Sequence, residues 1–459
     1  MSIDIVSLSR RLQRRYVDYL LSSHLLGEHE GALRRAFETE LDRVEVVSKG
    51  PILSILPTYE SGPSLNDLIG SSDVPAAHPE LRRLGNGAFD LDRPLYTHQV
   101  ESLRLALEGK SVVVATGTGS GKTECFLLPI LDEIVRRPAP GVRAIVVYPM
   151  NALANDQLGR LRELLRGLPA VTFGRYTGET PQTRADAEPK DLQEAIANER
   201  VSREEIQKEP PHILLTNFAM LEYLLIRPQD AGIFGHGSLE FVVLDESHTY
   251  TGAQGIDVSF LMRRVSRELS EKPLRFFLTS ATLTGATGDD GRSAAAAFAR
   301  TLTGADIQAE SVLFGQKVMP FRGVSVDLPK GRLLEAFGRA DSRDLWRRAL
   351  ASSGEMETLA DQHDLPLLAP GPGPLPSRLE AGLQRWAVVR AAYHALSEAP
   401  LTIEELSKTL FGESGPGEVR ATELLVDLGL AARRSPESYP LLPVRVHFFF
   451  RGLNGATVC

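Results

Sequence analysis

Residues 111–123 read Ser-Val-Val-Val-Ala-Thr-Gly-Thr-Gly-Ser-Gly-Lys-Thr, a β-branched run followed by a glycine-rich turn. The run 111–115 predicts a buried strand, and the apolar stretch 124–131 predicts the start of a packed helix. Between a strand and a helix, glycines let successive backbone N–H groups point at one anion, and the helix N-terminus adds partial positive charge. The stretch therefore predicts an α/β fold with a phosphate-binding loop over 116–123.

Two side chains at the end of this loop have the chemistry that a nucleoside triphosphate requires. We expect the Lys122 ammonium to reach the β- and γ-phosphates and the Thr123 hydroxyl to hold Mg²⁺. The strict loop pattern places a glycine five residues before Gly121, where this chain has Thr116. The alternative is a glycine-rich turn with a chance lysine, and the flanking strand and helix favour the phosphate-binding loop.

Composition indicates an ordinary globular protein. The 459 residues are 42% hydrophobic and 24% charged, and no apolar run approaches the ~18 residues that cross a bilayer. The N-terminus shows no basic segment followed by an apolar core, so we expect no secretory signal. Two cysteines argue against a disulfide framework and suit the reducing cytoplasm, where we expect the protein to act.

The charge balance gives no support for nucleic-acid binding by bulk charge. Against 51 Lys and Arg stand 59 Asp and Glu, a net charge of −8. A binder that relies on bulk charge would be basic. A protein that grips one strand transiently needs only a local polar track, so nucleic-acid binding stays open.

Four further stretches, 144–149, 212–217, 241–248 and 275–282, each contain an apolar run that predicts a strand of the same sheet. These runs are apolar throughout and alternate with helical stretches, which is typical of a mostly parallel sheet covered by helices on both faces. Residues 180–211 are dominated by charged and amide side chains, and we interpret them as a helical insertion. Function in such a fold belongs at the carboxyl ends of the strands.

Polar residues stand at those ends. Asp245 and Glu246 directly follow the run 241–244; the first carboxylate is predicted to help hold Mg²⁺ and the second to activate the attacking water. Gln99 lies 23 residues before Lys122 (122 − 99), and its amide offers the donor and acceptor that an adenine edge requires. Ser280 and Thr282 are predicted to hydrogen-bond back to the acidic pair.

Together these motifs resemble the first, RecA-like motor domain of a superfamily 2 helicase of the DEAD/DEAH kind. Gln99 corresponds to the Q motif, and the segments 116–123, 148–157, 216–217, 245–248 and 280–282 correspond to motifs I, Ia, Ib, II and III. Motif II reads Asp-Glu-Ser-His, where the DEAH form has alanine third. The sequences around 148–157 and 245–252 more narrowly resemble large bacterial helicases of DNA repair and phage defence, which carry a winged-helix insertion and a cysteine-rich C-terminal region.

The resemblance, which is specific over about residues 90–285, implies a role for each matching residue. ATP would be bound by Gln99, Thr118, Gly119, Ser120, Gly121, Lys122, Thr123 and His248. Catalysis would rest on Glu246, Asp245 and Lys122, with Mg²⁺ held by Thr123 and by Asp245, directly or through water. The nucleic-acid backbone would pass Pro149, Asn151, Thr216 and Asn217. Nucleotide state would be coupled to the domain through Ser280 and Thr282.

The same interpretation divides the chain into four segments. Residues 1–90 are expected to be a mostly helical accessory region, and 91–310 the RecA-like domain. Residues 311–380 are expected to be a connector, rich in proline and glycine over 355–380. Helical patterns followed by an apolar strand predict a winged-helix-like region over 381–459, for which contact with DNA and contact with another domain stay open.

A second RecA-like domain is not visible. The 177 residues after Thr282 (459 − 282) contain no Gln-x-x-Gly-Arg-x-x-Arg motif, so we expect the N-terminal portion of a longer helicase: a truncated product, a split-gene product or one half of a two-chain motor. Three functions remain: an ATP-dependent DNA helicase or translocase, an ATP-binding nucleic-acid-binding subunit that needs a partner chain, and a different P-loop enzyme such as a kinase. Gln99 and the Ser-Ala-Thr of motif III argue against the kinase. The preference for DNA over RNA rests on the narrower resemblance alone.

Overall fold

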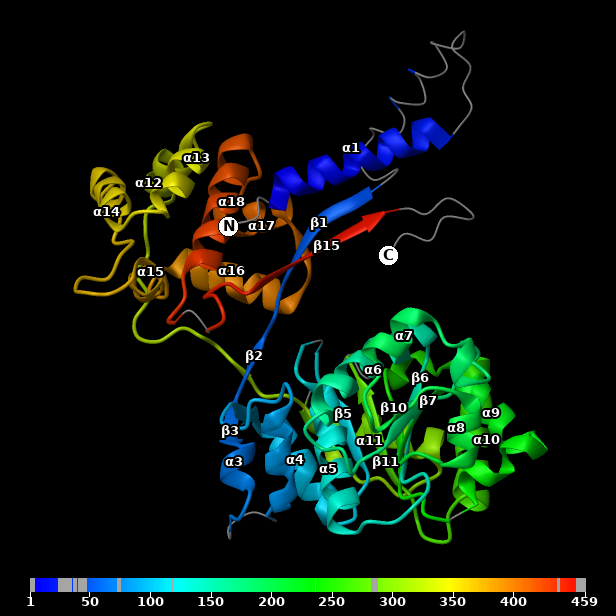
Figure 1. Ribbon diagram of the computed structural model, residues 1–459. Coiled ribbons are helices and arrows are strands. Elements are labelled where there is room, and N and C mark those ends of the chain that lie inside the picture. The colour runs from blue at the N-terminus through cyan, green and yellow to red at the C-terminus, as the bar shows by residue number, and fades with distance from the viewer. Residues whose placement is uncertain are drawn as a thin grey trace. The chain divides into compact units, whose positions relative to one another are not determined.

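The computed structural model describes residues 5–23, 35, 39, 48–71, 76–117, 119–235, 237–281, 288–435 and 438–450. Two predicted site residues, Thr118 and Thr282, lie outside these ranges. The chain forms two compact units: one is Thr58–Val318, and the other combines Met1–Pro57 with Met319–Cys459 (Figure 1). Within the described ranges, no helix is long and apolar enough to cross a membrane.

The Thr58–Val318 unit is built on an eight-stranded sheet with the order β12-β5-β11-β10-β6-β9-β7-β8. Every neighbouring pair in it runs parallel. Its strands are β5 (Val112–Ala115), β6 (Ala144–Tyr148), β7 (Phe173–Arg175), β8 (Glu199–Arg200), β9 (Ile213–Asn217), β10 (Phe241–Leu244), β11 (Arg275–Ser280) and β12 (Val312–Leu313). The expected parallel α/β sheet is confirmed, and all five apolar runs form strands.

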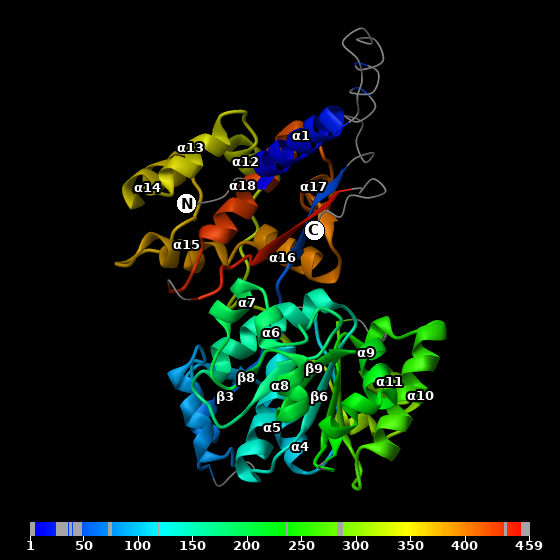
Figure 2. The ribbon, with the colours of Figure 1, turned by 45° about the vertical axis from the view of Figure 1, so that its right-hand side comes forward.

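Helices cover both faces of this sheet, because alternate strand residues point to opposite sides. Val112 and Val114 belong to one apolar core and Val113 to the other. The first core is shared with α4 (Thr97–Leu107), α5 (Lys122–Arg136) and α6 (Asn151–Leu165). The second is shared with α9 (Phe218–Ile226), α10 (Gly252–Glu268) and α11 (Gly288–Thr303), and Figure 2 shows the two groups on opposite sides of the strands.

Shorter elements complete this unit. They are β2 (Thr58–Tyr59), β3 (Ser61–Ser64), α3 (Leu65–Leu68), η1 (Pro79–Asn86), β4 (Pro94–Tyr96), η2 (Arg184–Asp186), α7 (Pro189–Glu194), α8 (Arg203–Lys208), η3 (Pro228–Phe234), η4 (Ser247–Thr249), η5 (Ala309–Ser311) and β13 (Lys317–Val318). β2 pairs with β13, and β3 pairs with β4, both antiparallel. The segment 180–211 is not purely helical, because β8 lies in it and extends the main sheet.

The other unit holds a three-stranded antiparallel sheet with the order β14-β1-β15, together with most of the remaining helices. Its elements are α1 (Ile5–Ser23), β1 (Ser48–Ile55), α12 (Lys330–Phe337), α13 (Ser342–Ala349), α14 (Ser353–Gln362), α15 (Leu375–Leu383), α16 (Ala387–Glu398), β14 (Leu401–Thr402), α17 (Ile403–Phe411), α18 (Pro416–Ala431) and β15 (Val444–Phe450). Leu53 and Ile55 of β1 share one core with Trp346 and Trp386.

These boundaries differ from the four segments expected from the sequence. Residues 48–55 pair with β15, so they belong to the C-terminal unit rather than to a separate accessory region. Residues 58–90 belong to the sheet unit, and the expected connector 311–380 contains the helices α12, α13 and α14 and the start of α15. The order α16, α17, α18, β15 is the helix-helix-helix-strand order that suggested a winged helix. Its sheet is completed by β1 from near the N-terminus.

Candidate nucleotide-binding site

The loop between β5 and α5 depends on glycines with left-handed backbone. Gly119 has φ +81° and Gly121 has φ +68°, a region that residues with a Cβ rarely adopt. A Cβ on Gly121 would also lie 2.2 Å from Nε2 of Gln99. Within the loop, the hydroxyls of Thr116 and Ser120 lie 2.5 Å apart and share a hydrogen bond. The loop is therefore tightly turned, as a phosphate cradle requires.

The start of α4 holds this loop from outside. Nε2 of His98 lies 2.9 Å from the carbonyl oxygen of Ser120, and Nε2 of Gln99 donates to the carbonyl of Gly121 at 3.0 Å. Oε1 of Gln99 accepts from the backbone N–H of Tyr96 at 2.8 Å. Burial lowers the pKa of His98, which keeps its imidazole neutral at pH 7. The Gln99 amide thus positions the loop, and its contact with adenine stays a prediction.

Tyr59 is a loop contact that sequence reasoning missed. Its hydroxyl accepts a hydrogen bond from the backbone N–H of Gly117 at 3.1 Å. Its buried ring packs edge-on against Tyr96 and His98, with centroids 5.5 and 5.3 Å apart. A lone tyrosine 37 residues before Tyr96 (96 − 59) carries no local signal of this role. It becomes visible only because β2 lies beside the loop.

The acidic pair meets the loop across the sheet. β11 separates β5 from β10, so the ends of these three adjacent strands converge at one edge. There Nζ of Lys122 donates to Oε1 of Glu246 at 2.9 Å. The Lys122 side chain is 11% exposed and that of Glu246 is 23% exposed, so the ion pair is largely shielded from water. Glu246 has φ +46°, a conformation that non-glycine residues hold at a cost of about 1–3 kcal/mol and that clusters at functional sites.

Thr279, another residue that sequence reasoning missed, orders the acidic pair. Its hydroxyl donates to Oδ1 of Asp245 and accepts from the backbone N–H of Glu246 at 3.2 Å. Burial raises the pKa of Asp245, and the hydrogen bond from Thr279 opposes that rise. A nearby divalent cation would favour the ionised carboxylate. Thr279 ends the apolar part of its strand, directly before the predicted motif III. The sequence therefore suggests a side chain that packs in the core and gives no sign that its hydroxyl contacts the acidic pair.

Ser280 and His248 extend this network. Oγ of Ser280 lies 3.2 Å from Nδ1 of His248, and that nitrogen lies 3.4 Å from Oε2 of Glu246. Among the described residues, Oε2 of Glu246 receives no hydrogen bond. The side chain expected to activate water therefore keeps one carboxylate oxygen without a donor, while the other is paired with Lys122.

The oxygen donors fit a magnesium–nucleotide complex better than a protein-only metal site. The described part of the chain contains no cluster of three or more His, Cys, Asp or Glu side chains that would hold a metal ion. Mg²⁺ commonly takes one or two protein oxygens together with substrate phosphates, and a hydroxyl and a carboxylate suit it. The Asp245 carboxylate is held by the Thr279 hydroxyl. Oγ1 of Thr123 contacts Gln157 at 3.4 Å and Arg160 at 3.1 Å, so in the structure this hydroxyl is engaged by other side chains.

The predicted nucleic-acid residues follow the next strands of the sheet. Asn151 begins α6, and its Oδ1 accepts from Nδ2 of Asn217 at 2.7 Å. Pro149 lies in the turn between β6 and α6. Thr216 is fully buried and its hydroxyl donates to the carbonyl of Tyr176 at 2.7 Å, so the structure does not present that hydroxyl to a ligand.

Comparison with known proteins agrees with this geometry. Residues 96–290 match the family described as DEAD/DEAH box helicase, a segment that contains every predicted site residue from Gln99 to Thr282. This match covers less than half of the 459 residues, and over it the chain is similar to the DEAD/DEAH box helicases.

The chain is also similar to individual proteins, at low sequence identity. Over 99% of this chain and 30% of its own length, the Druantia protein DruE of Escherichia coli (strain UMEA 4076-1) is 29% identical. The uncharacterized ATP-dependent helicase YprA of Bacillus subtilis (strain 168) is 32% identical over 41% of this chain and 23% of its own length. A crystal structure of the DUF1998 helicase MrfA bound to DNA and AMPPNP covers 82% of this chain and 43% of its own, with 20% identity and a TM-score of 0.42. The chain thus spans less than a third of DruE and of YprA.

Proposed function

We propose that this chain is the N-terminal motor half of an ATP-dependent DNA helicase or translocase that works in the cytoplasm. The observation that supports it best is the meeting of Lys122, Asp245 and Glu246 where β5, β11 and β10 end, behind a glycine loop of the required conformation. A kinase would not need Gln99 against this loop or a serine of motif III beside His248. ATP and Mg²⁺ are the expected ligands.

Each residue of the site has one task in ATP hydrolysis. Lys122 neutralises the β- and γ-phosphates, and to do so it separates from Glu246, which it contacts in the structure. The freed Glu246 carboxylate orients the attacking water and takes its proton. Thr123 and Asp245 would hold Mg²⁺, which when bound neutralises charge on the phosphate oxygens. Thr279 keeps the two carboxylates in their separate orientations.

The nucleic-acid strand would run along the neighbouring half of the same sheet edge. Asn151 and Asn217 are joined side chain to side chain there and offer amide groups to a phosphate backbone. DNA is the expected polymer because of the resemblance to DNA-repair and phage-defence helicases.

Because the chain spans only part of its relatives, we place the rest of the motor on additional sequence or on a partner chain. Helicases of this superfamily close a second RecA-like domain onto the nucleotide and supply arginine there. The alternative is an ATP-binding, nucleic-acid-binding subunit that hydrolyses ATP only with such a partner. The pairing of Glu246 with Lys122 is compatible with this alternative, since a paired base must first be released.

One assay decides between these functions. ATP hydrolysis by the purified chain is measured alone and with single-stranded DNA, double-stranded DNA and RNA, with Glu246→Gln as the matched inactive variant. Hydrolysis that rises with DNA and vanishes in the variant supports the motor. ATP binding without turnover supports the partner-dependent subunit. Absence of ATP binding refutes both.

A further inference from the structure

A row of polar side chains crosses the sheet edge beside the nucleotide site. The adjacent strands β6, β9 and β7 end there, followed or closed by Asn151, Asn217 and Glu179 respectively. Neighbouring strands are about 4.8 Å apart, which is within reach of these side chains. An acidic residue beside a proposed nucleic-acid track needs an explanation, because a carboxylate repels phosphate.

The Glu179 carboxylate accepts hydrogen bonds from two side-chain amides. Nδ2 of Asn151 donates to its Oε1 at 3.1 Å, and Nδ2 of Asn155 donates to its Oε2 at 3.0 Å. Nη1 of Arg175 lies 3.8 Å from Oε2. The hydrogen bonds from Asn155 and Asn151 hold the pKa of Glu179 below its ordinary value, so it is anionic at neutral pH.

The orientation of both amides is fixed by other contacts. Oδ1 of Asn151 accepts from Asn217, and Oδ1 of Asn155 accepts from Arg175. Each asparagine therefore turns its NH₂ group toward Glu179. Arg175 is only 11% exposed, so its charge is held in place rather than free in solvent. Two oriented donors and one cation make a site for an anion.

Glu179 is presented to this site by a braced turn. The backbone N–H of Thr177 donates to Oγ1 of Thr180 at 2.9 Å, and that hydroxyl donates to the carbonyl of Arg175 at 2.8 Å. The Glu179 side chain itself is 51% exposed. It can therefore leave its partners for water without disturbing the core, which distinguishes it from a buried structural acid.

We propose that Asn151, Asn155 and Arg175 form a phosphodiester-binding site on the nucleic-acid track, and that Glu179 occupies this site as an internal competitor. The inference rests on the proposed nucleic-acid function. A phosphate group binds the same partners as a carboxylate, namely oriented N–H donors and a guanidinium. Both anions cannot share the donors, so strand binding displaces Glu179 into solvent.

The proposal predicts a gain of affinity when the competitor is neutralised. Two unit charges about 4 Å apart in water repel by about 1 kcal/mol, which corresponds to roughly fivefold in binding. Glu179→Gln should therefore bind single-stranded DNA about fivefold more tightly. If Glu179 only orients the asparagines, the same substitution weakens binding.

The test uses the full chain and a fluorescein-labelled single-stranded DNA oligonucleotide, with anisotropy titrations at several salt concentrations. Glu204→Gln is the matched control, since Glu204 is exposed on α8 and its substitution changes the net charge equally. Asn155→Ala, also at an exposed position, should weaken binding and cancel the gain when combined with Glu179→Gln.

Each outcome is decisive. Tighter binding by Glu179→Gln, with Glu204→Gln within twofold of the wild type, supports the proposal. Unchanged or weaker binding by Glu179→Gln overturns it while leaving the proposed function intact. If neither the wild type nor Glu179→Gln binds the oligonucleotide, the proposed nucleic-acid function fails, and the inference with it.

Discussion

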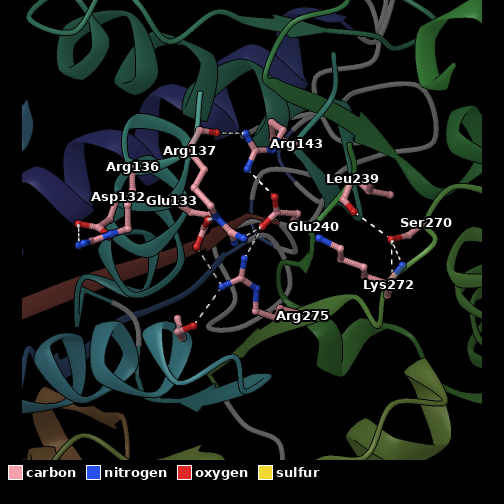
Figure 3. A network of polar contacts seen from close by, with 11 residues as sticks. Asp132, Glu133, Arg136, Arg137, Arg143, Leu239, Glu240, Ser270, Lys272 and Arg275 are labelled. Atoms are coloured by element: carbon pink, nitrogen blue, oxygen red, sulfur yellow. Dashed lines mark hydrogen bonds and ion pairs between the residues drawn. The ribbon is translucent and has the colours of Figure 1, made fainter. Parts of the chain in front are cut away.

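Glu240 is the hub of an ion network at the sheet edge opposite the nucleotide site, and its removal should destabilise the sheet unit alone. The residue directly precedes β10, and its carboxylate accepts from Arg143, Arg275 and Arg137 (Figure 3). Burial alone would raise the pKa of the adjacent Glu133, but contacts from Arg137 and Arg275 outweigh it and hold that pKa below the ordinary value. The perturbation is Glu240→Ala.

The magnitude follows from how exposed each arginine is. The Arg143 side chain is 2% exposed, and Glu240 is its only ion-pair partner among the described residues. Stranding a buried charge costs about 3–5 kcal/mol. Arg275 keeps Glu133 and the carbonyl of Ala106, and Arg137 is 57% exposed, so their losses are small. We expect a loss of about 3–5 kcal/mol in the free energy of unfolding.

Urea denaturation with two probes measures this effect. Both tryptophans, Trp346 and Trp386, lie in the other unit, so their fluorescence follows that unit alone. Far-UV circular dichroism follows both. With m-values of about 1–3 kcal/mol/M, the sheet-unit transition should move down by roughly 1–5 M, while the tryptophan transition stays in place.

Arg137→Ala is the contrasting variant, because an exposed ion pair contributes only about 0–1 kcal/mol. The reasoning is refuted if Glu240→Ala shifts the circular-dichroism transition no more than Arg137→Ala does. ATP affinity at low denaturant should be unchanged in both variants, since Glu240 lies at the amino ends of the strands.

Three further outcomes are expected at the nucleotide site. Lys122→Ala should weaken ATP binding roughly ten- to hundredfold, the range for a lost charged hydrogen bond, with the fold intact by circular dichroism; unchanged affinity in calorimetry would contradict the assignment. Glu246→Gln should keep ATP binding but lose about 10²–10⁴-fold in turnover, and a loss of binding instead would make Glu246 a metal ligand. The purified chain should turn ATP over slowly, since an arginine finger from a second domain contributes about 10³–10⁵ in rate. It should not unwind DNA until a chain with the second domain is added. Robust unwinding without a partner would show that the chain contains an unrecognised second motor domain.

Local patterns in the sequence were sufficient to predict the strands that carry the candidate nucleotide-binding site. The β-branched and apolar runs specify β5 and β10, and the glycines and acids at their ends have few other interpretations. The roles of Tyr59 and Thr279 were not predicted, because each acts through a single hydroxyl in a position where the side chain would be expected to pack in the core. Their roles depend on which strands become neighbours, and periodicity does not encode that.

The domain boundaries were not predicted correctly, for a related reason. β1 pairs with β15, nearly 400 residues later in the chain, and nothing in either segment identifies the other. The apparent connector over 355–380 was interpreted from its prolines and glycines. Most of those residues precede α15 rather than replace it: Pro374 stands directly before its first residue, Leu375, and Pro376 lies in its first turn.

The two predicted sites share one helix. α6 begins with Asn151 and carries Asn155 one turn later, both in contact with Glu179. Farther along the same helix, Arg160 donates to Oγ1 of Thr123 at 3.1 Å, at the end of the phosphate-binding loop. Arg160 lies nine positions after Asn151 on this helix, a rise of about 14 Å along the hydrogen-bonded backbone. If the Thr123 hydroxyl binds Mg²⁺ as proposed, it would release Arg160, and the same helix would carry that change to the asparagine amides that are proposed to bind a phosphate.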